Sequence, residues 1–302
     1  MPSLKAIRRR IASVASTQKT TRAMKLVSSA KLHRAQEAMG RAAPYITAMD
    51  ELARTLPKAL LESFEIGAGS QPRALIVVVA SDRGLCGAYN SNLMNTVDQL
   101  RTELRAKGLE AVFYAIGRRA VDHLNRTRAT IVQQRVNLRP RLATIELARD
   151  VASYVFAAYR RGEISEGGIA YSVFRSVFIQ RPTYRRLLPV ERPPSDTAKS
   201  AVSETKDERS VPDRYFLMEP GLALLAPLVV KSYLEAEIFD ALLNAETGEH
   251  AARMTAMDSA TNNAGEMIER LTLLMNRVRQ DSITRELMDI VGGAEALRES
   301  RS

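Results

Sequence analysis

The sequence lacks several residues on which common kinds of functional site depend. Its 302 residues contain no tryptophan and a single cysteine, Cys86, which excludes an intramolecular disulfide and a multi-cysteine metal site. His33, His123 and His250 are scattered without the spacing of metal ligands, so each is interpreted as a surface or capping residue. No apolar run approaches the roughly 18–20 residues of a membrane span, and an integral membrane protein is not expected.

Glycine-rich phosphate-binding motifs are also missing. The loop after the first apolar run contains only Gly84 and Gly87, which do not form G-x-G-x-x-G, and no G-x-x-x-x-G-K-[ST] occurs. The two glycines are expected to allow a tight strand-to-helix turn that Ser81 and Asp82 cap, with a weak anion site as the alternative. Cys86 has no histidine nearby in sequence, which indicates an inert thiol. The sequence therefore predicts no catalytic residue, no cofactor site and no metal site.

Positive charge is abundant. The net charge is +10, from 44 basic and 34 acidic residues, which implies an acidic partner. Nine basic residues precede the first acid, Glu37: Lys5, Arg8, Arg9, Arg10, Lys19, Arg22, Lys25, Lys31 and Arg34. A partner-facing helix is favoured, and a nucleic-acid contact or an Arg- and Ser-rich transit peptide are the alternatives. Aromatic residues do not interleave with these charges, which argues against base stacking.

A long helix is predicted near the C-terminus. One set of apolar positions repeats at heptad spacing, and a second set three residues later completes a coiled-coil seam. The first set is Met257, Ala264, Leu271 and Val278, and the second is Ala260, Met267 and Leu274. Asp281 and Arg285 occupy the next two seam positions, and the apolar residues Ile283, Leu287 and Ile290 that follow are in a different phase. The helix is therefore expected to pack against a partner helix up to about Val278 and to continue beyond it with a different neighbour. Gly292 and Gly293 indicate a helix stop.

The N-terminus supplies a partner. Leu4, Ile7, Ile11 and Val14 repeat the same seam, which turns polar over residues 16–22. It is expected to recover loosely through Met24, Val27, Ala30, Ala35, Ala38 and Ala42, in a helix that runs to about Leu61. The two helices are predicted to form an antiparallel pair, and an ordinary helical core is the alternative.

Between the helices, buried strands alternate with amphipathic helices. Strands are predicted at 74–80, 111–117 and 129–136, a helix at 144–165, and one alternating strand that leaves the domain at 167–190. The predicted fold class is α/β, an antiparallel coiled coil of long terminal helices plus a central doubly wound, mostly parallel α/β domain. The predicted divisions are the N-terminal helix 1–61, the α/β domain 73–190, a variable segment 191–213 and the C-terminal helix 214–302.

Three blocks carry a resemblance to a known family. Residues 3–38, 81–93 and 249–297 closely resemble, in order, the gamma subunit of rotary ATP synthases of bacterial type. The resemblance covers nearly the whole chain apart from 191–213. Because the resembling block begins at Ser3, no transit extension is expected to precede it.

The resemblance implies a mechanical role. Family members are the central-stalk rotor shaft, which couples ion flow through the membrane rotor ring to ATP synthesis or hydrolysis on the alpha and beta subunits. The implied partners are three alpha and three beta subunits, the epsilon subunit and the c subunits of the rotor ring, with one copy of this chain per complex. The implied location is peripheral, on the cytoplasmic face of the bacterial plasma membrane, with membrane contact only through partners and no nucleic acid bound.

The resemblance also implies contact residues. Those expected to face the alpha/beta ring are Met24, Lys25, Arg253, Arg279, Gln280, Thr284 and Glu286. Those expected to face epsilon and the rotor ring are Phe216, Leu217, Met218 and Glu219. Two other classes compete with the shaft: a nucleic-acid-binding coiled-coil protein, suggested by the basic N-terminal helix, and a dinucleotide-dependent enzyme, suggested by the α/β pattern alone.

Overall fold

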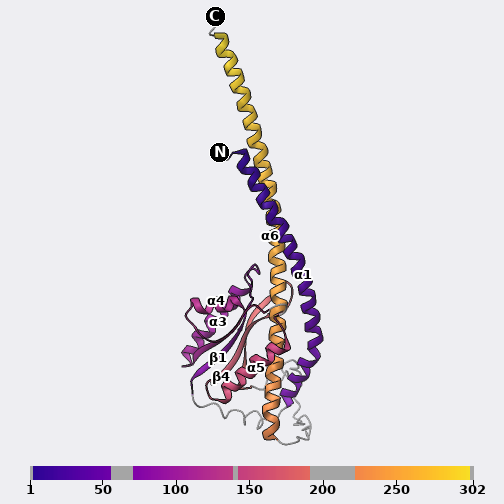
Figure 1. Ribbon diagram of the computed structural model, residues 1–302, viewed down its shortest axis with the longest axis vertical. Helices are drawn as coiled ribbons and strands as arrows, with labels where there is room; N and C mark the ends of the chain where they lie inside the picture. The colour runs from indigo at the N-terminus through magenta and orange to yellow at the C-terminus, as the bar shows by residue number, and fades with distance from the viewer. Residues whose placement is uncertain (1–2, 56–70, 139–141, 191–221, 300–302) are drawn as a thin grey trace, which may run out of the picture. The chain divides into compact units, whose positions relative to one another are not determined.

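The computed structural model describes residues 3–55, 71–138, 142–190 and 222–299. Its elements are drawn in Figure 1. The contacts divide the chain into two compact units: one contains residues 1–30 and 253–302, and the other contains residues 31–252. Two long helices, α1 (Leu4–Thr55) and α6 (Leu222–Glu299), contribute to both units.

The larger unit is built on a five-stranded sheet. Its strands are β1 (Arg73–Val79), β2 (Glu110–Ile116), β3 (Thr130–Arg135), β4 (Glu166–Phe174) and β5 (Gln180–Leu188). They lie in the order β3-β2-β1-β4-β5, and all neighbours are parallel except the pair of β4 with β5. The central strand β1 is an apolar run buried on both faces, as a parallel sheet requires. The predicted mostly parallel α/β domain is confirmed.

The single alternating strand expected at 167–190 is wrong. The segment forms a hairpin, because β4 and β5 pair antiparallel around a turn at 175–179 and both stay in the sheet. The backbone N–H groups of Arg175 and Ser176 both donate to Ile179 O, at 3.1 and 3.2 Å, which closes the turn. The turn contains no Gly, Pro, Asn or Asp, so the sequence gave no strong sign of the reversal.

Helices cover both faces of the sheet. On one face, α3 (Tyr89–Ala106) and α4 (Arg118–Arg126) bury an apolar core with Leu93, Val97 and Phe113. On the other face, α5 (Ile145–Arg160) packs with the α6 residues Leu234 and Ile238. The hydroxyl of Thr144 caps α5 by accepting from Leu147 N at 3.2 Å. Partly buried α1 residues, among them Met39, pack against this second core, so both terminal helices are part of the domain.

In the smaller unit, α1 and α6 run antiparallel. Thr261 Oγ1 lies 2.8 Å from Thr21 Oγ1, and Lys25 Nζ lies 2.6 Å from Asp258 Oδ1. The two positions of each pair add to 282 or 283, so the start of α1 at Leu4 is opposite about residue 278 or 279 of α6. The expectation that the partner helix ends near Val278 agrees with this register.

The second set of seam positions on α6 is wrong by one residue. Met267 and Leu274 are 45% and 39% exposed, whereas Ile268 and Met275 are partly buried. The second set of seam positions therefore lies four residues, and not three, after Met257 and Ala264. The polar Thr261 is the first member of this set. Sequence patterning favoured Ala260 because it counted only apolar side chains.

The seam on α1 also differs from the expectation. It keeps its heptad period through the polar stretch, where Thr21 and Ser28 are buried, while Val27 is 58% exposed and Ala30 is exposed. Short hydroxyl side chains fit where two helices approach closely, and they bond across the seam or to their own backbone.

Two helix ends differ as well. α6 continues through Gly292 and Gly293 to Glu299, because glycine costs a helix only about 1 kcal/mol relative to alanine and strong helix formers follow. α1 contains Pro44 and is described to Thr55, and the predicted end near Leu61 lies outside the described residues. The segment 191–213 also lies outside them. The four predicted divisions remain predictions.

Candidate functional site

Beyond about Val278, α6 has no partner helix among the described residues. Beyond Val278, the described side chains through Val291 are exposed, apart from the partly buried Asp281. The predicted contact residues Arg279, Gln280, Thr284 and Glu286 all lie on this exposed stretch. Their contacts with an alpha/beta ring remain a prediction.

The same stretch carries apolar residues that the predicted contact set omitted. Ile283 and Leu287 are 50% and 57% exposed, and Ile290 and Val291 are 68% and 59% exposed. Their spacing of four and then three or four residues places them along one side of the helix. The sequence did signal this stripe as a change of phase after Val278. An apolar stripe that the described part of the chain leaves exposed is typical of a partner-binding surface.

The other predicted ring contacts, Met24 and Lys25 on α1 and Arg253 on α6, have mixed surroundings. Met24 is partly buried, and Lys25 is held by its ion pair with Asp258. Arg253 is only 8% exposed, so its own chain covers most of it. Leu26 and Val27 are 66% and 58% exposed and were not among the predicted contacts. The second predicted set, Phe216 to Glu219, lies outside the described residues.

In the loop after β1, side chains bond to one another and to neighbouring backbone groups. Asp82 accepts from Arg118 N and from Leu138 N, both at 2.9 Å, so it caps α4 and fixes a second loop. Asn90 donates to Ser81 Oγ at 2.8 Å and contacts the buried Cys86 Sγ at 3.0 Å. The expected roles of Ser81 and Asp82 are therefore partly different: Ser81 bonds inside the loop, and Asp82 acts on the next helix.

The crevice at the carboxyl ends of β1 and β4 is where parallel sheets of this kind bind ligands. Here α6 packs against it. Tyr89 Oη donates to Ala245 O at 2.9 Å, and Phe174 N donates to Asn244 Oδ1 at 3.2 Å. A Cβ on Gly248 would lie 3.2 Å from the Tyr89 ring, so glycine allows this close approach. α6 therefore covers the edge of the sheet at which doubly wound folds bind ligands.

An acidic cluster is buried beside this contact. Arg185 on β5 pairs with Glu237, which is 3% exposed, and Asp240 lies one helical turn farther along α6. Burial raises the pKa of Glu237 and of Asp240, and Arg185 opposes both shifts. Burial likewise raises the pKa of Tyr171 to about 12. The Arg185–Glu237 pair joins the edge strand to the long helix.

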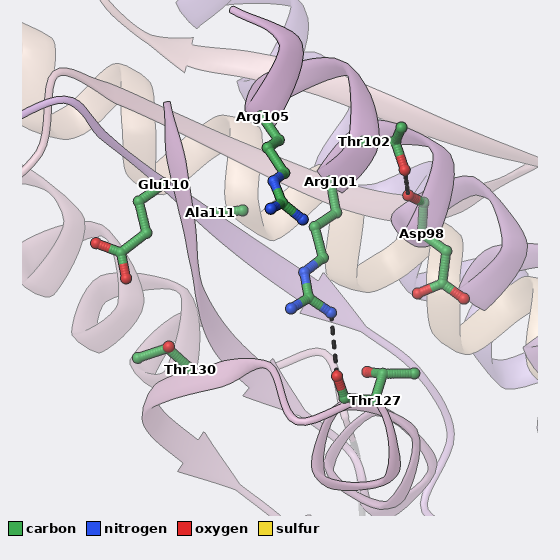
Figure 2. Close-up of a pocket in the computed structure, with 8 residues that line it drawn as sticks. All are labelled: Asp98, Arg101, Thr102, Arg105, Glu110, Ala111, Thr127 and Thr130. Carbon is green, nitrogen blue, oxygen red and sulfur yellow. Dashed lines mark hydrogen bonds between the residues drawn. The ribbon is translucent and has the colours of Figure 1, made fainter. Parts of the chain in front are cut away.

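A surface hollow of about 700 Å³ lies where β2 and β3 begin (Figure 2). Its lining residues are Asp98, Arg101, Thr102, Arg105, Glu110, Ala111, Thr127 and Thr130. Arg101 donates to Thr127 O at 3.2 Å, just past the end of α4, and Asp98 lies 3.0 Å from His123 Nε2. Glu110 pairs with Arg73 at 2.8 Å. These charges hold helix and strand ends together, and the lining contains no nucleophile with an adjacent base.

The described part of the chain contains no group of three or more His, Cys, Asp or Glu residues arranged to hold a metal ion. None of its helices has a stretch long and apolar enough to cross a bilayer.

The fold is shared with rotor chains of known structure. A chain of the central stalk and c-ring of the Tetrahymena thermophila mitochondrial ATP synthase is 20% identical, with a TM-score of 0.55 over 80% of this chain and 99% of that chain. A rotor chain of the Euglena gracilis mitochondrial ATP synthase is 16% identical, with a TM-score of 0.64 over 93% of this chain and 98% of that one. Long terminal helices joined to an α/β sheet thus define a central-stalk class of fold.

Sequence comparison identifies the family within this class. Residues 3–297 match the ATP synthase family. The ATP synthase gamma chain of Pelotomaculum thermopropionicum is 39% identical, and that of Rhizobium etli is 38% identical, each over 98% of this chain and 100% of the relative. The chain belongs to the ATP synthase gamma chain family. It is therefore a subunit of an ATP synthase, with a role in ATP synthesis and ion transport.

Proposed function

We propose that this chain is the rotating shaft of its ATP synthase and has no catalytic site of its own. In this proposal, α1 and α6 stand inside a ring of alpha and beta subunits, and the α/β unit contacts epsilon and the c subunits of the rotor ring. One copy serves each complex, on the cytoplasmic face of a bacterial plasma membrane. Membrane contact is through partners only.

The observation that carries the proposal is the exposed apolar stripe of α6 beyond Val278. The side chains of Ile283, Leu287 and Ile290 expose apolar surface to water, which is unfavourable. A ring of partner subunits would cover this surface. Because α6 continues there beyond the start of α1, its contacts with the surrounding subunits are asymmetric. Rotation of an asymmetric shaft then changes those subunits in turn.

Two features support a non-catalytic role. α6 packs against the crevice at the carboxyl ends of β1 and β4. In the surface hollow, Arg101 donates to a backbone carbonyl, Asp98 contacts His123, and Glu110 pairs with Arg73. The proposal therefore assigns nucleotide binding and hydrolysis to the alpha and beta subunits.

Assembly tests the proposal directly. The purified chain is mixed with alpha and beta subunits of the same source, the complex is isolated by size, and MgATP hydrolysis is measured. We expect a complex with one copy of this chain and an ATPase rate well above that of the separate subunits. A chain that hydrolyses ATP alone, or one that stays apart from alpha and beta, would contradict the proposal.

The basic surface of α1 motivates one control. Most of the cations that precede Glu37 are exposed, as a nucleic-acid-binding helix would also require. Duplex DNA binding should therefore be measured across a salt series. Tight binding at physiological salt, together with failure to assemble, would favour the nucleic-acid function.

A further inference from the structure

The turn between β4 and β5 exposes a large aromatic side chain. Phe178 is 82% exposed and the adjacent Ile179 is 49% exposed, while Val177 beside them is partly buried. A single exposed apolar residue is ordinary on a protein surface. Here two occur together at the tip of a hairpin, away from both apolar cores of the sheet.

This turn is held rigidly by its own hydrogen bonds. Ser176 Oγ accepts from Phe178 N at 3.3 Å and from Ile179 N at 3.1 Å. Gln180 Nε2 donates to Ser176 O at 3.0 Å and to Val177 O at 2.9 Å. The backbone that carries Phe178 is thus fixed before any partner arrives. Preorganisation of this kind lowers the entropic cost of binding, and it is typical of an aromatic anchor at an interface.

The charges around the turn are of one sign. Arg175 precedes it and Arg181 follows it, and both are exposed. Within the described residues, neither guanidinium has a salt bridge or a side-chain hydrogen bond. On the same edge strand, Arg185 is already paired with Glu237. Two uncompensated guanidinium groups therefore flank the aromatic tip.

We propose that residues 175–181, named here the anchor turn, dock into an apolar pocket rimmed by carboxylates on another protein subunit. Phe178 and Ile179 fill the pocket, and Arg175 and Arg181 pair with its acidic rim. Charge complementarity selects this occupant, because a pocket rimmed by basic residues would be repelled. The inference rests on the proposed function, since the occupant is a subunit of the same complex.

Photo-crosslinking in the assembled complex identifies the occupant. Phe178 is replaced by p-benzoylphenylalanine in the full chain, which is assembled with alpha, beta and epsilon subunits of the same source and then irradiated. Val132, which is 38% exposed on the opposite edge strand β3, receives the same label as a control. We expect a crosslink from position 178 to a peptide of another subunit in which Asp or Glu flanks apolar residues, and little from position 132.

Binding kinetics supply the second test. Phe178→Ala is expected to speed dissociation of the chain from the complex at least tenfold, and Phe178→Leu to restore part of the loss. Arg175→Gln with Arg181→Gln should weaken the salt dependence of association. None of these variants should lower the Tm of the isolated chain, because the side chains lie outside its core.

The outcomes separate the two proposals. A complex that assembles and stays intact with Phe178→Ala, without a crosslink at position 178, overturns the anchor turn alone. A crosslink to a basic peptide or to a second copy of this chain also overturns it. A chain that forms no complex overturns both proposals, because the occupant is then absent.

Discussion

Polar residues occupy the middle of the seam between α1 and α6. Thr21 and Thr261 bond each other across the seam at 2.8 Å, and each hydroxyl is also within bonding distance of a carbonyl oxygen of its own helix. Lys25 and Asp258 form an ion pair one turn away. Polar groups inside a coiled coil cost stability but fix which residues face each other. We expect this layer to set the register of the two helices.

A double-mutant cycle tests the hydroxyl pair. Thr21→Val or Thr261→Val alone should destabilise the local pairing by about 1 kcal/mol, because the remaining hydroxyl loses its cross-helix partner. The double substitution should cost less than the sum of the two, since neither hydroxyl is then left without its partner. Hydrogen exchange of α6 amides near residue 261 measures the effect. Thr20→Val is the matched control, because Thr20 is exposed and bonds only within α1; strictly additive effects would contradict the coupling.

The buried acids on α6 make stability depend on pH. Burial raises the pKa of Glu237 and of Asp240 in the folded chain. At a pH above 4.5, the ordinary pKa of Glu237, the folded state therefore binds more protons than the unfolded state. This stabilising contribution is complete below pH 4.5 and is lost as pH rises through the folded-state pKa.

Glu237→Gln should therefore flatten the pH dependence. The neutral amide removes one titrating group, which changes the slope by at most about 1.4 kcal/mol per pH unit. Thermal unfolding between pH 4.5 and 7.5 is the measurement, and the variant is expected to lose less stability than the natural chain as pH rises. Glu103→Gln, an exposed site on α3, is the control. An unchanged pH profile in Glu237→Gln would show that Glu237 does not titrate in this range.

At the scale of the helices, the exposed end of α6 is expected to matter for coupling in the complex and little for the stability of the isolated chain. Deletion of residues 279–302 removes no seam contact with α1, because α1 begins opposite about residue 278. We expect the Tm of the isolated chain to change by less than about 2 °C, because little buried apolar surface is lost. Ion pumping driven by ATP hydrolysis in the assembled complex should fall strongly.

Ile7→Ala gives the opposite pattern and serves as the control. Ile7 is 3% exposed in the seam, so its truncation should cost about 2–5 kcal/mol of local stability while the exposed stripe stays intact. Full coupling after the deletion would contradict a role for the stripe.

Element prediction from the sequence succeeded where one physical effect dominated. The run 74–80 is apolar throughout, and it forms the buried strand β1 because only a doubly covered parallel strand tolerates such a run. Prediction failed where tertiary contacts override the apolar pattern. Thr261 sits in the seam because Thr21 bonds it, and the hairpin at 175–179 closes because Ser176 accepts two backbone bonds. Neither contact is visible in local periodicity.

The contact residues show the same division. Arg279, Gln280, Thr284 and Glu286 came from family resemblance, and the exposed Ile283 and Leu287 beside them were recognised only as a change of phase. Periodicity alone cannot tell an apolar side chain that packs within its own chain from one that waits for another subunit.

At the scale of the whole molecule, net charge should govern the rate of assembly. The chain carries +10, and Arg8, Arg9 and Arg10 are exposed at the start of α1. Long-range attraction speeds the encounter with an acidic partner and is screened by salt. Association with alpha and beta subunits should therefore slow by about tenfold or more between 50 and 500 mM salt, measured by stopped-flow mixing.

Changing those three arginines to glutamine should reduce this salt dependence. The same change at Arg105, Lys107 and Arg128, exposed cations of the α/β unit, is the matched control. Equal effects of the two triple variants would show that only total charge matters, and not its location on α1.

The antiparallel pair also dictates an order of events during synthesis. Thr21 and its partner Thr261 are 240 residues apart in the chain. The helix α1 is synthesised first, and it cannot pair with α6 until most of the chain has been made. At about 5–20 residues per second, that delay is roughly 10–50 s. The α/β unit also draws on α6, since Leu234 and Ile238 belong to its core, so it too is incomplete until late. The apolar side of α1 therefore stays exposed to solvent for most of translation. The yield of folded protein in a cell should depend on chaperones that bind this exposed surface, and more strongly than the stability of the folded chain suggests.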